Sequence, residues 1–193
     1  MKRARTLIVV LLLFSSVAVA RKRDPLTEAE ADQLRDARLE PQKRLKLFIK
    51  FTDARLDTLD ELRSDPKQVQ GRGAKIHDLL EDFTSLIDEI SSNLDAYGTE
   101  TLDKEQSKQF HKGTKDLIDA TARWTDRLRA LRNAIQMDPE AKAESRDYDF
   151  TLRDAEDALK SCSESAHDYS EEKNEEKPAR YELVASLTST HES

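Results

Sequence analysis

The sequence predicts an all-α protein: an antiparallel up-down bundle of four long helices with a short N-terminal helix and a mobile C-terminal tail. Two observations predict this class. Charged residues make up 37% of the chain and only 4 of its 193 residues are glycine, whereas an average globular domain has about 25% charged residues. Apolar residues also recur at alternating spacings of four and three, the pattern of a helix that buries one narrow seam.

The first 20 residues have the pattern of a signal peptide. Basic residues open the segment, an apolar run from Leu7 to Ala20 follows, and Ala18 and Ala20 supply the small side chains that a signal peptidase reads. A helix needs about 20 apolar residues to span a bilayer. We therefore expect cleavage after Ala20, export to the periplasm or the medium, and no stable membrane insertion afterwards. The basic residues 21–23 favour the alternative of an uncleaved anchor, because positive charge after an apolar segment resists translocation.

Removal of 20 of the 193 residues leaves 173, a length that suits one domain. We divide the chain into a signal peptide (1–20), an N-terminal extension with a short helix (21–40), the four-helix bundle (41–174) and a flexible tail (175–193). The short helix is expected over residues 28–38, because Thr27 and Glu30 form a capping box. Glu40 ends that segment, since a residue before proline avoids helical geometry.

The four long helices are expected at about residues 41–63, 74–97, 102–137 and 139–173. Pro41 suits the first position of a helix, and Gly98 is expected to end the second helix in a left-handed conformation. The seam residues are Leu45, Phe48, Ile49, Thr52, Leu56 and Leu59 in the first helix; Ile76, Leu80, Phe83, Ile87, Ile90, Leu94 and Tyr97 in the second; Phe110, Thr114, Leu117, Thr121, Trp124, Leu128, Leu131 and Ile135 in the third; and Tyr148, Leu152, Ala155, Leu159, Cys162, Ala166 and Tyr169 in the fourth.

The net charge of the long helices alternates in sign. It is +2 over residues 41–64, −4 over 72–97, +3 over 102–137 and −8 over 138–177. This alternation predicts a ring in which consecutive helices are neighbours and like charges lie on the diagonals.

The mature chain, with 29 basic and 39 acidic residues, has a net charge of −10. This acidic balance argues against non-specific nucleic-acid binding, which needs a basic surface, and against docking on anionic lipid. An oligomer is compatible with the seams, because heptads pair within a chain or between chains.

One short motif resembles part of a di-iron site. Glu164 and His167 match the Glu-x-x-His element of ferritin-like bundles, but that chemistry needs a second such element. His77 and His111 follow Ala74 and Lys108 at the same spacing, so neither completes it. We expect a solvated pair, and the four histidines (77, 111, 167 and 191) show no metal-ligand spacing. The sequence predicts no catalytic residue, no metal site and no cofactor site.

Single residues of chemical interest have structural interpretations. Cys162 lies at a seam position and is expected to be a buried filler, with a reactive or intermolecularly paired thiol as the alternative. The segment 71–73 is expected to form a turn rather than a phosphate loop. Gly113 indicates close packing or a kink, with a gap for a ligand as the alternative. The aromatic residues Phe83, Phe110, Trp124 and Tyr148 are expected in the core.

Two features lie near the C-terminus. The acidic run in residues 138–177, which ends in Glu171-Glu172 and Glu175-Glu176, is expected to be a solvated face, since a helical run lacks the convergence of a cation site. The tail carries a small apolar group that we expect to dock on the body, with docking on a partner as the alternative. The group consists of Tyr181, Leu183, Val184 and Leu187.

These observations predict a non-enzymatic function. We expect an exported, non-enzymatic interaction or scaffold module of the cell envelope, whose partner is a protein or another envelope component. The alternative is a helical-bundle carrier of a small ligand or a metal ion. Its cavity would form at the weak points of the core, which are Gly113, Thr114, Thr121 and Cys162.

Overall fold

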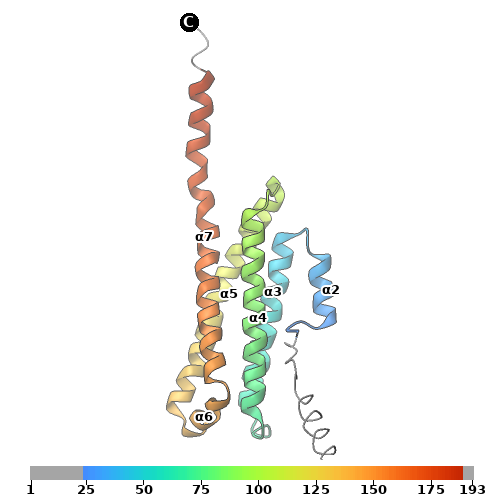
Figure 1. Ribbon diagram of the computed structural model, residues 1–193, viewed down its shortest axis with the longest axis vertical. Coiled ribbons are helices and arrows are strands. Elements are labelled where there is room, and N and C mark those ends of the chain that lie inside the picture. The colour runs from blue at the N-terminus through green and yellow to red at the C-terminus, as the bar shows by residue number, and fades with distance from the viewer. Residues whose placement is uncertain (1–23, 189–193) are drawn as a thin grey trace, which may run out of the picture.

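The computed structural model describes the backbone of residues 24–188 and the side chains of residues 24–170, so the expected signal peptide lies outside the described residues. Helices α3 (Pro41–Ser64), α4 (Arg72–Thr99), α5 (Lys104–Met137) and α7 (Asp149–Thr188) run side by side, and α2 (Glu28–Asp36) packs against α3 (Figure 1). The predicted all-α bundle of four long helices with a short N-terminal helix is confirmed. Among the described residues, no helix is both long and apolar enough to cross a membrane.

The order of the helices around the bundle differs from the prediction. α3 packs against α4 and α5, and α7 packs against the same two helices. The ring is therefore α3–α4–α7–α5, and the connection from α4 to α5 crosses a diagonal. The predicted ring of consecutive neighbours is wrong, because surface charge pairs contribute too little free energy to decide which buried seams meet.

Two pairs of neighbours run parallel. Gly73 lies beside Asp147 and Gly98 lies beside Tyr169, so α4 and α7 point the same way. Trp124 of α5 donates a hydrogen bond to Asp53 of α3, and further along both helices Arg127 pairs with Asp60. The chain direction still alternates from one long helix to the next, as the up-down prediction requires.

The fourth predicted helix is divided. A short helix, α6 (Pro139–Glu144), and a 3-10 turn (Ser145–Asp147) precede α7. The Asp138 side chain caps α6, and the turn brings Tyr148 into the core, where it is 2% exposed. α7 continues to Thr188, beyond the predicted end near residue 173, and projects past the other helices (Figure 1). The predicted mobility of the tail and the position of its apolar group stay predictions, because those side chains lie outside the described residues.

The predicted seams form the core. All seven seam residues of α4, all eight of α5 and six of the seven of α7 are buried, while Tyr169 is partly buried. In α3, Ile49 is only partly buried and Phe51 lies in the core instead. Trp124 meets Phe83 edge-on at 6.1 Å between ring centroids, and its Nε1 donates to Oδ1 of Asp53 at 2.6 Å. The four aromatic residues are therefore core residues, as predicted.

The N-terminal helix is held by one arginine. The predicted capping box between Thr27 and Glu30 is present. Arg55 of α3 donates to both carboxylate oxygens of Glu30, at 2.8 and 2.6 Å, and to the carbonyl of Pro25 at 2.6 Å. The hydrogen bond from Arg55 lowers the pKa of Glu30 to about 2. α2 therefore covers the α3/α4 side of the bundle, where the Tyr97 hydroxyl donates to the carbonyl of Arg38.

The glycines have the predicted roles except at Gly98. Gly98 lies within α4, which ends at Glu100, so the predicted left-handed cap at Gly98 is wrong. A Cβ atom at Gly98 would lie 2.7 Å from Cζ of Tyr169. At Gly113 it would lie 2.9 Å from Cδ1 of Leu45, so close packing against α3 explains that glycine. Gly71, in the predicted turn, has the left-handed conformation with φ of 71°.

Substitution of Gly98 by alanine tests the contact between α4 and α7. A Gly→Ala change at an unobstructed helix position stabilises by about 1 kcal/mol, but here the new methyl group displaces the Tyr169 ring. We expect a loss of roughly 1–3 kcal/mol in the free energy of unfolding, measured by urea denaturation. In a Tyr169→Ala background the same change should become stabilising. A stabilising Gly98→Ala change in the native background would contradict the packing.

The Glu30–Arg55 contact predicts a pH dependence of stability. The pKa of Glu30 falls from 4.5 in the unfolded chain to about 2, so its contribution is complete above pH 4.5 and is lost as the pH falls towards 2. We expect Glu30→Gln to lower the free energy of unfolding by up to roughly 3 kcal/mol at pH 7. The difference from the native chain should vanish near pH 2. An equal loss at both pH values would show that the ion pair is not its cause.

Candidate interaction surfaces

The pairing of α4 with α7 brings two acidic helices together. α4 and the described part of α7 (residues 149–170) each hold two basic and six acidic residues, a net charge of −4 each. Glu81, Asp88 and Asp95 are exposed and lie seven residues apart, so they share one side of α4. That side faces α7, because Asp95 accepts a hydrogen bond from the Tyr169 hydroxyl at 2.9 Å. We call Glu81, Asp88, Asp95 and the exposed Asp154 of α7 the acidic face.

The pairing of α3 with α5 brings two basic helices together on the opposite side. α3 has a net charge of +2 and α5 a net charge of +4. Gly113 of α5 lies beside Leu45 of α3, and Lys46 lies near Asp116, so α3 begins alongside the middle of the first half of α5. Residues 41–52 and 104–115 follow one another along this side of the bundle and hold eight basic residues and one acidic residue. Seven of the eight are exposed lysines, which we call the basic patch. They are Lys43, Lys46 and Lys50 of α3 and Lys104, Lys108, Lys112 and Lys115 of α5.

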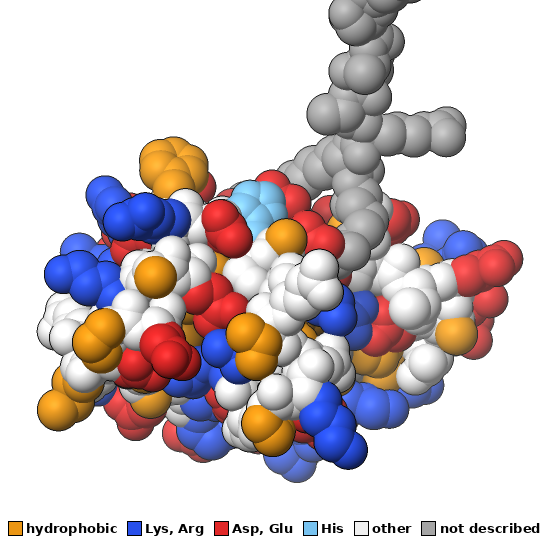
Figure 2. Space-filling model, turned by 90° about the horizontal axis from the view of Figure 1, so that it is seen from below, with side chains coloured by type: hydrophobic (Ala, Val, Ile, Leu, Met, Phe, Trp, Pro, Cys, Tyr) orange, Lys and Arg blue, Asp and Glu red, His pale blue; other side chains and the backbone are white. Residues whose placement is uncertain are grey.

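Ion pairs neutralise the second halves of α3 and α5 but only part of the basic patch. Arg127 binds Asp57 at 2.9 Å and Asp60 at 2.6 Å. In the basic patch, Lys46 lies 3.6 Å from Asp116 and Lys43 lies 2.9 Å from Glu40. Figure 2 looks onto the lower end of the bundle, the end farthest from the basic patch, and shows Lys and Arg side chains interspersed with Asp and Glu side chains, some of which surround a histidine.

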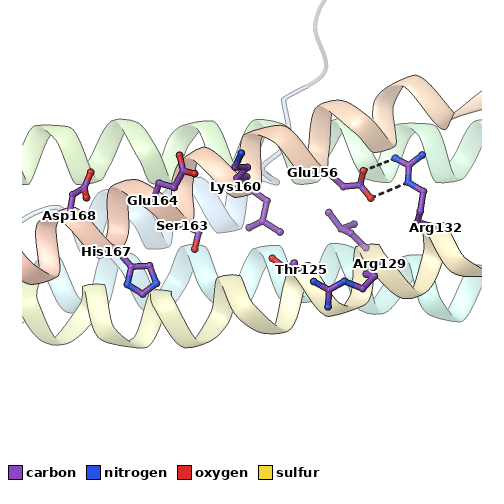
Figure 3. Close-up of a pocket in the computed structure, with 11 residues that line it drawn as sticks. Thr125, Arg129, Arg132, Glu156, Lys160, Ser163, Glu164, His167 and Asp168 are labelled. Carbon is purple, nitrogen blue, oxygen red and sulfur yellow. Dashed lines mark hydrogen bonds and ion pairs between the residues drawn. The ribbon is translucent and has the colours of Figure 1, made fainter.

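A groove of about 650 Å³ runs between α5 and α7 (Figure 3). Leu128 and Leu159 supply its apolar lining. At one end Arg132 donates to both oxygens of Glu156, at 3.2 and 2.6 Å, and these bonds raise the pKa of Arg132. The other end carries charged and polar side chains. These are Lys160, Ser163, Glu164, His167 and Asp168.

The Glu-x-x-His element lies on the rim of this groove. Glu164 and His167 are both exposed, so the element faces solvent and does not point into the bundle core, where ferritin-like sites are built. His111 is half-buried on α5, and His191 lies outside the described residues. The described histidines at 77, 111 and 167 therefore belong to three different helices.

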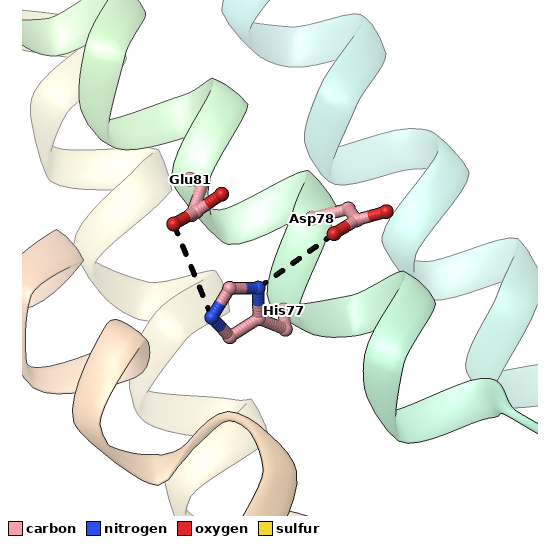
Figure 4. A group of neighbouring side chains, drawn as sticks. All are labelled: His77, Asp78 and Glu81. Atoms are coloured by element: carbon pink, nitrogen blue, oxygen red, sulfur yellow. Dashed lines mark ion pairs between the residues drawn. The ribbon is translucent and has the colours of Figure 1, made fainter. Parts of the chain in front are cut away.

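Sequence reasoning missed one group of possible metal ligands. His77 lies 3.7 Å from Asp78 and 3.9 Å from Glu81, and one ligand atom from each lies within 4.8 Å of the others (Figure 4). The spacing of four residues between His77 and Glu81 on one helix could have indicated it. All three side chains come from α4 and open to solvent. Ligands of one tetrahedral zinc ion lie about 3.4 Å apart, so the three side chains would have to move closer together to bind one. The group shares Glu81 with the acidic face.

The positions predicted to be weak points of the core are filled. Leu45 packs on Gly113. The Thr114 hydroxyl donates to the carbonyl of Phe110 at 2.9 Å, and the Thr121 hydroxyl donates to the carbonyl of Ile118 at 2.9 Å. Cys162 is fully buried, and burial raises the pKa of its thiol to about 11, which the hydrogen bond with Ser91 opposes. These contacts give no support to a ligand cavity at the four positions.

The burial of Cys162 predicts slow thiol chemistry. Because burial raises its pKa, the nucleophilic thiolate is scarce at pH 8 and reagents cannot reach it. We expect a chromogenic disulfide reagent to modify less than about a tenth of the native protein in an hour and all of it in urea. A Cys162→Ala variant controls for background colour. Rapid stoichiometric reaction of the native protein would contradict a structural role.

No family model matches the sequence, and no curated protein or solved structure is significantly similar to it. A function must therefore be inferred from the surfaces described above.

Proposed function

We propose that the mature chain is an exported, non-enzymatic interaction or scaffold module of the cell envelope. The observation that carries this proposal is the segregation of charge: an acidic face on α4 and α7, and a basic patch on α3 and α5, on opposite sides of one bundle. Complementary charge guides association and the choice of partner. Two such surfaces on a rigid body allow it to hold two charged partners at once.

The proposed location rests on the sequence. The N-terminal 20 residues have a basic start, a short apolar run and small residues before the expected cleavage site. An exported chain with one cysteine has no intramolecular disulfide, so its fold depends on packing, and the continuous buried seams meet that need.

The strongly shifted ionisable groups support a non-enzymatic function. Catalytic acids, bases and nucleophiles commonly have perturbed pKa values in a cleft. Here the pKa of Glu30 is lowered by its bond with Arg55, and the pKa of Cys162 is raised by burial in the core. Neither group lines the groove between α5 and α7. Both shifts therefore come from contacts that hold the fold.

The groove between α5 and α7 favours a second candidate function. Its volume of about 650 Å³ and its leucine lining suit a small amphipathic molecule with charged groups at one end. In this second candidate, the module carries such a ligand on its surface rather than in its core.

Site-specific photo-cross-linking in the native envelope tests the proposed function. A cross-linking residue at Asp88 samples the acidic face and one at Lys112 samples the basic patch, while one at the exposed Gln33 of α2 is the matched control. We expect discrete adducts from Asp88 or Lys112, absent from Gln33 and reduced by about tenfold as salt rises to 0.5 M. Equal labelling from all three positions would contradict the proposal. A small defined mass retained in native mass spectrometry, without adducts, would establish the carrier function instead.

A further inference from the structure

We propose that the partner of each charged surface is a second copy of this chain, with the acidic face of one copy bound to the basic patch of the next. This inference rests on the proposed interaction function and names its partner. Both binding surfaces are present on the described molecule, so one contact accounts for both. With any other kind of partner, two different partners are needed to account for both surfaces.

The two surfaces complement each other in charge and in extent. The basic patch has seven exposed lysines, and Lys50 and Lys112 form no ion pair with any described residue. The acidic face presents Glu81, Asp88 and Asp95 in a row along α4. At 1.5 Å per residue, the 14 residues from Glu81 to Asp95 span about 21 Å, and the 11 residues from Lys104 to Lys115 span about 17 Å.

Both surfaces are open to a second copy. α2 covers the α3/α4 side, through its contacts with Arg55 and Tyr97, and leaves the α3/α5 side uncovered. On the other side the carboxylates of Glu81, Asp88 and Asp154 are exposed. Ser91 and Ala158 are the small residues that α4 and α7 place among these charged residues. The exposed Phe150 of α7 lies one turn before Asp154.

The geometry sets the kind of assembly. In the ring α3–α4–α7–α5, the α4/α7 side lies opposite the α3/α5 side. An interface between two different patches is heterologous, so each copy keeps one free acidic face and one free basic patch for further copies. The assembly therefore grows as a row rather than stopping at a two-fold dimer. It is also salt-sensitive, because exposed ion pairs are screened within about 10 Å at 0.1 M salt.

Anionic lipid and nucleic acid fit these surfaces less well. The mature chain carries a net charge of −10, which repels both from a distance. Either would occupy the basic patch alone and leave the acidic face without a partner. A second copy supplies an oppositely charged surface for both the acidic face and the basic patch.

The test uses two neutralised variants of the mature chain. The basic-patch variant is Lys50→Gln with Lys112→Gln, and the acidic-face variant is Glu81→Gln with Asp88→Asn. All four side chains are exposed, and circular dichroism and thermal unfolding check that both variants fold. Sedimentation velocity measures mass against concentration at low salt. We expect the native chain to form oligomers that dissociate in 0.5 M salt, and each variant alone to associate about tenfold more weakly.

Mixing the two variants gives the decisive result. The basic-patch variant keeps its acidic face and the acidic-face variant keeps its basic patch, so the mixture should form a 1:1 complex that grows no further. A native chain that stays monomeric at low salt would overturn the inference. So would a mixture that associates no better than either variant alone, because the acidic face and the basic patch are then not in contact with each other. Monomers that bind a polyanion through Lys50 and Lys112 would also overturn it, while envelope adducts to other proteins would leave the proposed function standing.

Discussion

The architecture depends on close contact between parallel helices, and glycines permit that contact. Gly73 and Gly98 let α4 approach Asp147 and Tyr169, and Gly113 lets α5 approach Leu45 of α3. Burial of a large apolar side chain contributes about 1.5–3 kcal/mol, whereas an exposed ion pair contributes about 0–1 kcal/mol. Packing at these positions therefore outweighs repulsion between helices of like charge. The order of the ring, and with it the position of every surface group, follows from this balance.

The sequence was sufficient for the elements and the core. Every predicted seam residue of α4 and α5 is buried, because the side that a helix buries is a local property of its sequence. Gly73 and Leu86 of α4 and Gly113 and Ala120 of α5 are also buried and lie outside the predicted seams. The seam spacing did not predict helix order, because order depends on the flanks of the seam. In α4 one flank carries Leu79 and Leu86 and the other carries Thr84, Ser91 and Gly98, and neither set specifies which helix lies beside it. Gly98 could have indicated the side on which α7 packs. It stands one position after the seam residue Tyr97, and such a flanking glycine indicates where a neighbour comes close.

The candidate surfaces were harder to predict, because they depend on the order of the helices. The net charge of each long helix could be counted, but the acidic face exists only because α4 lies beside α7. Asp95 and Tyr169 are 74 residues apart in the chain and meet through a hydrogen bond. The interruption before α7 was also hidden, since the seam spacing continues from Tyr148 while the backbone turns at Ser145–Asp147. The His77 group is different, because its three residues are neighbours on one helix and a search that included carboxylates would have found it.

The placement of the charges contributes little to the stability of the bundle. Cations are unfavourable near a helix N-terminus and anions near a C-terminus, each by about 0.3–1 kcal/mol. In the first turns, Lys43 of α3 and Lys104 of α5 are placed unfavourably, and α3 has no acidic residue there. α5 offsets its lysine with Glu105 and the capping residue Asp103. At the other face Asp95 lies near the end of α4, which has no basic residue in its last turn. Repulsion between like-charged neighbours opposes this arrangement, and core packing outweighs it, since exposed charge pairs contribute only about 0–1 kcal/mol each.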